Sequence, residues 1–281
     1  MQYVSLPRRQ LNCGSKFLDL SQPHVMGILN VTPDSFSDGG LHNSKQQAVD
    51  YAIQMIADGA TVIDIGGEST RPGAAEVTVE EELARVIPVV EALSDQDVIL
   101  SIDTSQPEVM RQAVHAGAHI WNDVRALTRP KALETAAELQ VPVILMHMRG
   151  EPTTMNQLAN YEHVTLEVIT ELRQKIDLAQ QAGIAAENIL IDPGFGFAKT
   201  IDQNFELLRH LDIFKNLDLP ILAGVSRKSM IHKTLQIKPE EALNGTTVLN
   251  TLALEKGAAI LRVHDVKEAV ETIKLWQKVS I

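Results

Sequence analysis

Short apolar runs recur along the chain, and each one ends in a polar or glycine-containing stretch. Runs that are apolar on both faces and joined by helical patterns, without hairpin turns, are typical of a parallel sheet, because crossover helices cover both of its faces. The pattern predicts eight strands of this kind. They occupy residues 24–30, 61–67, 98–104, 118–123, 141–148, 188–194, 219–226 and 258–265.

The segments between these runs show helical periodicity and boundary signals. The first helix has Asn43 or Ser44 as its candidate N-cap and Gly59 at its predicted end. The second begins with a capping box formed by Thr78 and Glu81. The residues expected on one face of the first helix are Ala48, Tyr51, Ala52, Met55 and Ile56. Further helical patterns span residues 161–182, 239–256 and 266–278.

Eight strand-and-helix units in succession favour a closed (β/α)₈ TIM barrel, an α/β fold, over the alternative of an open, doubly wound sheet. The barrel is expected to occupy residues 25–281 as a single domain. Residues 1–24 precede the repeat, and a small hairpin about Cys13 to Ser15 is expected to cap the N-terminal end of the barrel.

Charge and cysteine content narrow the function classes. The net charge of −11, from 25 basic and 36 acidic residues, disfavours nonspecific nucleic-acid binding as the main activity. The single cysteine, Cys13, has no partner for an intrachain disulfide, which favours the reducing cytoplasm. The sequence shows neither a secretion signal nor an apolar run of about 18 residues, so no association with a membrane is expected.

Polar side chains gather where the predicted strands end, and in a parallel barrel these C-terminal ends form the active site. Asp103, Asn122 and Asp192 offer acceptors suited to the N–H groups of a flat heterocycle, although each could instead cap a helix. His147 could bind a metal, but a hydrogen-bonded structural role is the more common one for an isolated strand-end histidine. A second set offers cationic donors to a phosphate or carboxylate, namely Arg71, Arg227, Lys228, Arg262 and His264.

Seven motifs in these strand-end segments together resemble the dihydropteroate synthase family of pterin-binding barrels. They follow the family's order from Val25 to Val266, which is most of the chain. The motifs are GILNVTPDSFSDGG, GGESTRPGA, SIDTS, MHMRGEP, DPGFGFAKT, GVSRKS and RVHDV. The motif DPGFGFAKT has Ala198 where the family has glycine, so a backbone with positive φ at this position would be strained.

The resemblance implies a homodimeric transferase of folate biosynthesis that uses Mg²⁺. Such an enzyme joins 4-aminobenzoate to (7,8-dihydropterin-6-yl)methyl diphosphate and releases 7,8-dihydropteroate and pyrophosphate. Carried over by motif, the residues that would bind the pterin diphosphate are Thr70, Asp103, Asn122, Asp192, Lys228, Arg262 and His264. Those that would form the aminobenzoate pocket are Phe36, Arg71, Pro72, Phe197 and Ser229.

The resemblance also places Asn30 at the diphosphate and near Mg²⁺. Because a neutral aniline is a weak nucleophile, we expect an SN1-like route in which pyrophosphate departs before aminobenzoate attacks. Asp103, Lys228 and Arg262 are the expected catalytic residues, with Asp103 offsetting the developing positive charge. Residues 31–40 are expected to form a closing loop that brings Phe36 over the second substrate.

Two other functions remain open from the sequence. A methyltetrahydrofolate–corrinoid methyltransferase on the same barrel would explain the ring-binding carboxylates but would leave the diphosphate-binding set without a purpose. A non-catalytic pterin-binding module would also contain both sets of residues. Against it, no position in the carboxylate and cationic sets appears substituted, as would be expected after loss of activity. Small molecules, and no nucleic acid or membrane, are the expected partners in each case.

Overall fold

Eight parallel strands close into a barrel in the computed structural model, which describes residues 10–32, 40–69 and 77–280. Neighbouring strands follow the order β10-β3-β4-β5-β6-β7-β8-β9, with β10 pairing β3 to complete the ring. The predicted barrel is therefore confirmed, and the open-sheet alternative is wrong. The strands are β3 (His24–Asn30), β4 (Val62–Gly66), β5 (Ile99–Asp103), β6 (Ile120–Asp123), β7 (Val143–Met146), β8 (Ile189–Asp192), β9 (Ile221–Ala223) and β10 (Ala258–Val263).

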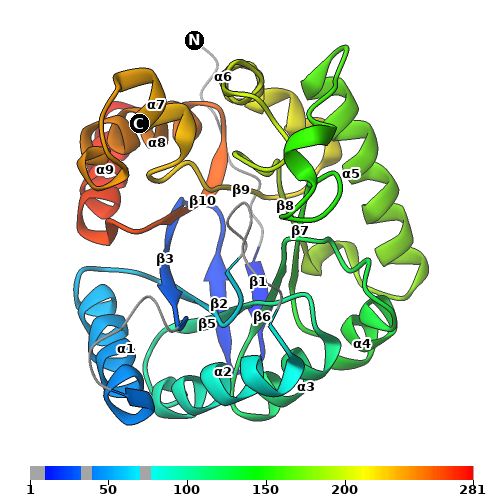
Figure 1. Cartoon of the computed structure of the whole chain (residues 1–281), viewed down its shortest axis with the longest axis vertical. Coiled ribbons are helices and arrows are strands. Elements are labelled where there is room, and N and C mark those ends of the chain that lie inside the picture. The colour runs from blue at the N-terminus through cyan, green and yellow to red at the C-terminus, as the bar shows by residue number, and fades with distance from the viewer. Residues whose placement is uncertain (1–9, 33–39, 70–76, 281) are drawn as a thin grey trace.

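Helices surround the strands on the outside of the barrel (Figure 1). The residues that β-strand alternation turns outward, such as Val25, Ile63 and Leu100, are buried against these helices. The helices are α1 (Gly40–Ala57), α2 (Val79–Leu93), α3 (Pro107–His115), α4 (Ala132–Leu139), α5 (Val164–Gln181), α6 (Ile201–Arg209), α7 (Ser229–Leu235), α8 (Leu243–Glu255) and α9 (Val266–Ser280). Short 3₁₀ turns occur at Met155–Leu158, Ala186–Asn188, Leu211–Leu217 and Pro239–Glu241.

The expected start of α1 was wrong. The helix begins at Gly40, upstream of both Asn43 and Ser44, because a capping preference is weak and locates a helix end only approximately. Tyr51 lies at the edge of the buried stripe and is exposed, and its hydroxyl donates to the carbonyl oxygen of His264 at 3.3 Å. The capping box predicted at Thr78 does begin α2.

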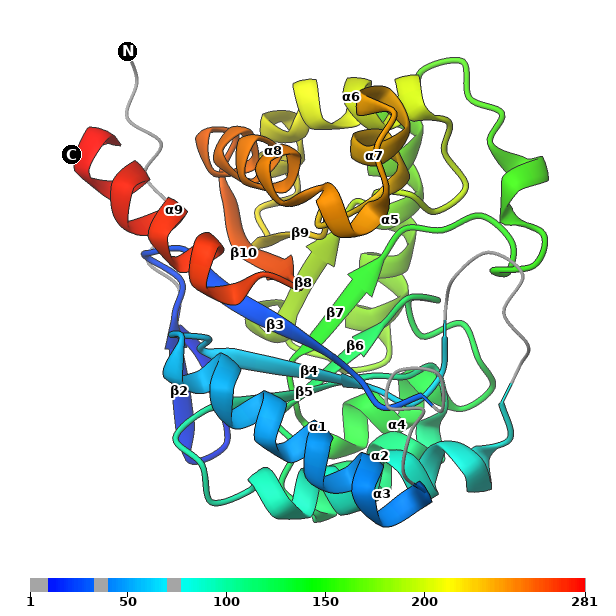
Figure 2. The same ribbon diagram turned by 60° about the vertical axis from the view of Figure 1, so that its left-hand side comes forward.

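The predicted hairpin closes the N-terminal end of the barrel. Strands β1 (Gln10–Cys13) and β2 (Lys16–Asp19) pair antiparallel, and Figure 2 shows them at the end opposite the βα loops. Leu11, Cys13 and Leu18 are buried against a layer of apolar side chains that comes from all eight barrel strands. That layer consists of Met26, Val62, Ile99, Ile120, Ile144, Leu190, Leu222, Ala259 and Ile260.

The alternation of side chains along each strand also determines which residues face the barrel interior above this apolar layer. Residues two positions further along β4 and β6 face the same way, so Asp64 and Asn122 lie inside the barrel above Val62 and Ile120. The interior therefore changes from apolar at the hairpin end to polar at the C-terminal ends of the strands. This polar layer forms the floor of the site.

Candidate active site

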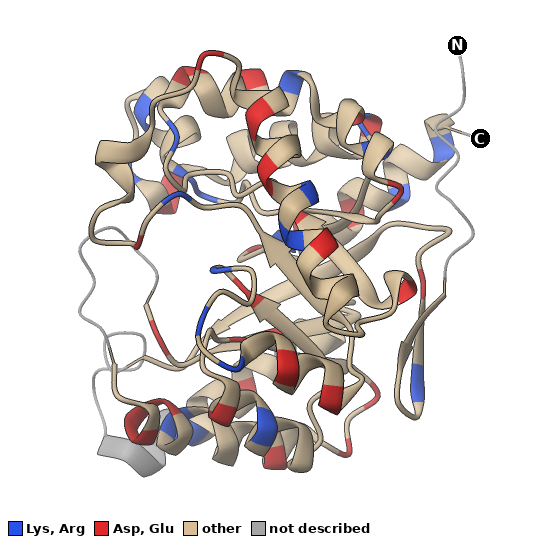
Figure 3. Ribbon diagram, turned by 90° about the vertical axis from the view of Figure 1, so that its right-hand side faces the viewer, with Lys and Arg blue, Asp and Glu red and all other residues tan. Residues whose placement is uncertain are grey.

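A cavity of about 660 Å³ opens at the C-terminal ends of the strands. Every predicted site residue in the described part of the chain lines it: Asn30, Asp103, Asn122, Asp192, Phe197, Lys228, Ser229, Arg262 and His264. The predicted residues Phe36, Thr70, Arg71 and Pro72 lie outside the described residues, as does most of the expected closing loop at 31–40. Acidic and basic residues occur together on the loops at this end of the barrel (Figure 3).

Arg262 joins two carboxylates across the floor of the cavity. Its Nε donates to Asp64 Oδ2 at 2.7 Å, and its Nη2 donates to Asp103 Oδ2 at 2.8 Å. Asn122 Nδ2 donates to the same Asp64 oxygen at 3.0 Å. Asp64 thus fixes the orientation of two predicted ligand-binding side chains from below.

Asp64 was missed in the sequence. Its position within the apolar run VIDIG was a usable signal, because a carboxylate facing a barrel interior needs hydrogen-bonding or charged partners. Only the closed barrel shows that those partners come from β6 and β10, on different sides of the ring.

The floor carries more carboxylate than cationic charge. Burial raises the pKa of Asp103 to about 7, with the guanidinium of Arg262 lowering it and Asp64 raising it. Burial also raises the pKa of Asp192, and the Gly194 N–H that donates to Asp192 Oδ1 at 2.7 Å opposes the rise. Each raised pKa means that the buried carboxylate has lost solvation by water. A positive charge or an N–H donor of a ligand would replace that solvation and would itself be stabilised.

Cationic and neutral donors from the loops after β9 and β10 also line the cavity. Lys228 Nζ lies 4.3 Å from the centre of the Phe197 ring, close enough for a cation–π contact. The Ser226 hydroxyl accepts from the backbone N–H of His264 at 3.2 Å and also lies within hydrogen-bond distance of His264 Nδ1, at 3.0 Å. The tautomer with its proton on Nε2 lets Ser226 donate to Nδ1 and leaves the Nε2 proton for an anion.

His264 is neutral in this environment. Burial, together with the nearby Arg262 and Arg227, lowers the pKa of its imidazole to about 4. Arg227 itself forms a bidentate ion pair with Asp265, which joins the loops after β9 and β10.

Arg125, which the sequence did not single out, connects four of the βα loops. Its Nε donates to Glu151 at 2.6 Å, and its Nη1 donates to Glu68 at 3.1 Å and to Ser105 Oγ at 3.0 Å. Ser105 in turn donates to Asp123, which also accepts the Arg125 and Leu127 N–H groups at 2.8 and 2.7 Å. Glu68 lines the cavity next to the segment that carries the predicted Thr70, Arg71 and Pro72.

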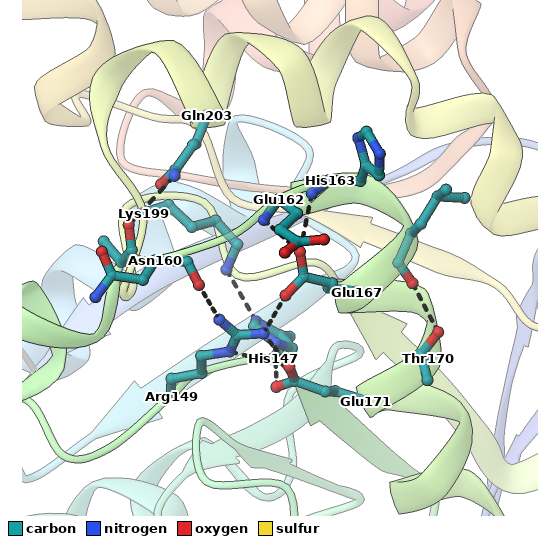
Figure 4. Close-up of polar contacts among 12 residues, drawn as sticks. His147, Arg149, Asn160, Glu162, His163, Glu167, Thr170, Glu171, Lys199 and Gln203 are labelled. Carbon is teal, nitrogen blue, oxygen red and sulfur yellow. Dashed lines mark hydrogen bonds and ion pairs between the residues drawn. The ribbon is translucent and has the colours of Figure 1, made fainter.

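His147 and Arg149 follow β7 but do not line this cavity. His147 Nε2 pairs with Glu171 at 3.0 Å, and Arg149 pairs with Glu167 and Glu171 of α5 (Figure 4). The hydrogen-bonded structural role expected for His147 is confirmed. Among residues 10–32, 40–69 and 77–280, no group of three His, Cys, Asp or Glu side chains could hold a metal ion.

Fold and site together define a class: a (β/α)₈-barrel enzyme whose cavity has a carboxylate and amide floor beside a cationic rim. A family model described as "Pterin binding enzyme" matches residues 26–264. The dihydropteroate synthase of Escherichia coli K12 is 56% identical over 259 residues, covering 92% of each chain.

Solved structures agree with the sequence relatives. A Xanthomonas albilineans dihydropteroate synthase with 4-aminobenzoic acid superposes with a TM-score of 0.92 at 48% identity, covering 97% of this chain and 98% of that one. The same species' enzyme in complex with 7,8-dihydropteroate gives 0.88 at 46% identity, covering 96% and 98%. The chain therefore belongs to the dihydropteroate synthase family of pterin-binding enzymes. Within the described residues, none of the helices is both long and apolar enough to span a membrane.

Proposed function

We propose that this chain condenses 4-aminobenzoate with (7,8-dihydropterin-6-yl)methyl diphosphate to give 7,8-dihydropteroate and pyrophosphate. The observation that carries the proposal is the division of one cavity into a carboxylate and amide floor and a rim of cationic and N–H donors. The relatives named above, whose structures contain 4-aminobenzoic acid and 7,8-dihydropteroate, support it. The methyltransferase alternative has no use for this rim.

The floor binds the pterin. Asp103, Asn122 and Asp192 present acceptors to the N–H groups of the ring from β5, β6 and β8. Lys228 and the plane of Arg262 complete the ring site, and Thr70 and His264 are assigned to the diphosphate, His264 through its Nε2 proton. Phe36, Arg71, Pro72, Phe197 and Ser229 are assigned to aminobenzoate.

The reaction proceeds through a pterin-stabilised cation. The bond between the pterin methylene carbon and the diphosphate oxygen breaks, and its electron pair leaves with pyrophosphate. The aniline nitrogen of aminobenzoate then forms the new C–N bond and loses its proton to solvent. Asp103 offsets the positive charge on the pterin and Lys228 helps to fix the ring, while Arg262 and His264 stabilise the departing anion.

Mg²⁺ is part of this proposal. The metal prefers oxygen ligands, keeps several waters and usually binds one or two protein oxygens together with substrate phosphates. The Asn30 side-chain oxygen, at the rim of the cavity, fits such a site as a single protein ligand. When bound, Mg²⁺ neutralises charge on the leaving pyrophosphate.

We propose that the enzyme is a homodimer and resides in the cytoplasm. Leu235 of α7 and Val248 and Leu252 of α8 are about half exposed on adjoining helices, and they would be buried by a second copy. The single cysteine supports the location, which cell fractionation tests.

Mixing both substrates with Mg²⁺ tests the activity, with pyrophosphate and dihydropteroate as the measured products. In single-turnover experiments Asp103→Asn should slow pyrophosphate release by about 10² to 10³, because it removes the charge that stabilises the cation. Pterin diphosphate affinity should change much less. Asp95→Asn, at an exposed position, is the matched control. An unchanged release rate in Asp103→Asn would rule out its electrostatic role.

A further inference from the structure

The loop between β8 and α6 contains one residue, Ala198, in a backbone conformation that its residue type does not favour. Gly194, Gly196 and Ala198 have φ values of 73°, 81° and 48°. Glycine adopts this left-handed region freely, but for alanine it costs roughly 1 kcal/mol. Ala198 is fully buried, so the surrounding structure must hold the loop in place.

Lys199 supplies that support from behind the loop. Its buried Nζ lies 3.0 Å from each of three acceptors: the carbonyl oxygens of Gly194 and Phe197, and His147 Nδ1. An ammonium group has three N–H bonds, and here each has one acceptor. Two of the bonds close the loop on itself, and the third ties it to the end of β7.

His147 in turn is hydrogen-bonded to Glu171 of α5 (Figure 4). Glu171 is a carboxylate that can only accept, so the His147 Nε2 proton is donated to Glu171 Oε2 at 3.0 Å, and the Nδ1 of the neutral ring accepts from Lys199. Burial and the nearby Lys199 lower the pKa of His147 to about 4, which keeps the ring neutral and fixes this tautomer. Arg149 in turn holds Glu171 and stacks on Tyr161, 3.8 Å from its ring centre.

The front of the same loop faces the cavity. Phe197 lines the cavity and contacts Lys228, while the Gly194 N–H donates to Asp192. A side chain at Gly196 would place its Cβ 3.1 Å from Lys228 Cδ, so the loop packs closely against that lysine. A shift of the loop would therefore move the Phe197 ring before it moved the strand-borne carboxylate of Asp192.

We propose that Lys199 is a positioning residue for aminobenzoate: through His147 and two loop carbonyls it holds the β8–α6 loop so that Phe197 lies against the second substrate. This role rests on the proposed function, which assigns Phe197 to the aminobenzoate pocket. Lys199 acts through the loop and does not touch the reacting atoms.

Lys199→Met tests the proposal, because methionine keeps the length and apolar body of the side chain but donates no hydrogen bond. The KM for aminobenzoate should rise by about 10- to 100-fold, as expected for a misplaced positioning group, while the dissociation constant of pterin diphosphate changes by less than about threefold. Lys267→Met, at an exposed position on α9, is the control and should leave both constants unchanged.

His147→Gln provides a second variant should Lys199→Met fail to fold. It leaves Lys199 its two carbonyl acceptors, so the same rise in KM should appear at a smaller size. An unchanged KM, or an equal loss of aminobenzoate and pterin binding, overturns the role of Lys199. Wild-type turnover is measured alongside: a wild type that forms no dihydropteroate overturns the proposed function, and with it this role, whereas an active wild type with an unchanged variant overturns this role alone.

Discussion

Glu82, in the first turn of α2, is a buried carboxyl group in contact with the active-site loops. Only 1% of the residue is exposed, and a Cβ at Gly67 would lie 2.9 Å from its Cγ. Within the described residues its Oε1 has no hydrogen-bond partner. Burial raises the pKa of Glu82 to about 7, with a hydrogen bond to Thr104 lowering it and Glu68 raising it.

This raised pKa predicts a specific pH dependence of stability. Between the ordinary pKa of about 4.5 and the folded value of about 7, the native state binds more protons than the unfolded state. The free energy of unfolding should therefore fall as pH rises through this window. Glu82→Gln should flatten that decline and stabilise the protein at pH 8 by about 1 to 2 kcal/mol. Urea unfolding at pH 5 and pH 8 measures it.

The exposed Glu80 provides the control for this experiment. Glu80→Gln keeps the wild-type pH dependence, because its carboxyl group stays in water in both states. A Glu82→Gln variant with the same pH dependence as wild type would contradict the explanation.

The backbone strain at Ala198 could be predicted from the sequence, but the contacts that support it could not. Comparison with the family motif indicated strain if its φ were positive, and the observed φ is 48°. The motif identified the unusual position, but the Lys199 contacts that support it join residues 52 positions apart, from Lys199 to His147.

At the level of elements, Arg125 stabilises the βα loops as a group. Its side chain is 5% exposed, and its partner Glu68 is 11% exposed. Glu68 and Glu151 come from the loops after β4 and β7, and Ser105 from the loop after β5. Removing one partner of such a pair leaves a desolvated charge behind, which costs more than removing both.

A double-mutant cycle measures this coupling. Arg125→Met should lower the free energy of unfolding by about 3 kcal/mol, and Arg125→Met with Glu68→Gln should lower it by less than the sum of the two single changes. Urea unfolding gives all four values. Arg111→Met, which breaks the exposed ion pair with Glu138, should have a far smaller effect. Additive changes at Arg125 and Glu68 would show that the pair is not coupled.

The strands and the α2 cap were predictable because their signals are local. A buried strand needs apolar residues on both faces, and a capping box needs only Thr78 and Glu81 three residues apart. The start of α1 was not, since Gly40, Asn43 and Ser44 are all acceptable near a helix end.

The whole molecule is a barrel closed at one end and open at the other. The hairpin seals the apolar end, where Lys16 Nζ donates to the carbonyl oxygens of Gln96 and Val98 at 2.7 and 2.8 Å. The cavity and its loops lie at the other end. Exposed apolar side chains on α7 and α8 remain on the outside.

The proposed homodimer predicts a mass in solution twice the 30.9 kDa of one chain. Light scattering after size exclusion measures it. Val248→Lys, which places a charge at a half-exposed apolar position on α8, should shift the mass toward one chain, because the charge would lose its water in the interface. A wild type that elutes as a single chain at micromolar concentration would contradict the dimer.

The sequence by itself determined the order of strands and helices, the hairpin, and which polar residues end the strands. These follow from periodicity and from motifs within one segment. Only the tertiary structure decided that Asp64 holds Arg262 and Asn122, that Arg125 joins four loops, and that Lys199 is anchored by His147. Such contacts depend on barrel closure and strand register, and a shift of one residue in register would turn these side chains to the opposite face.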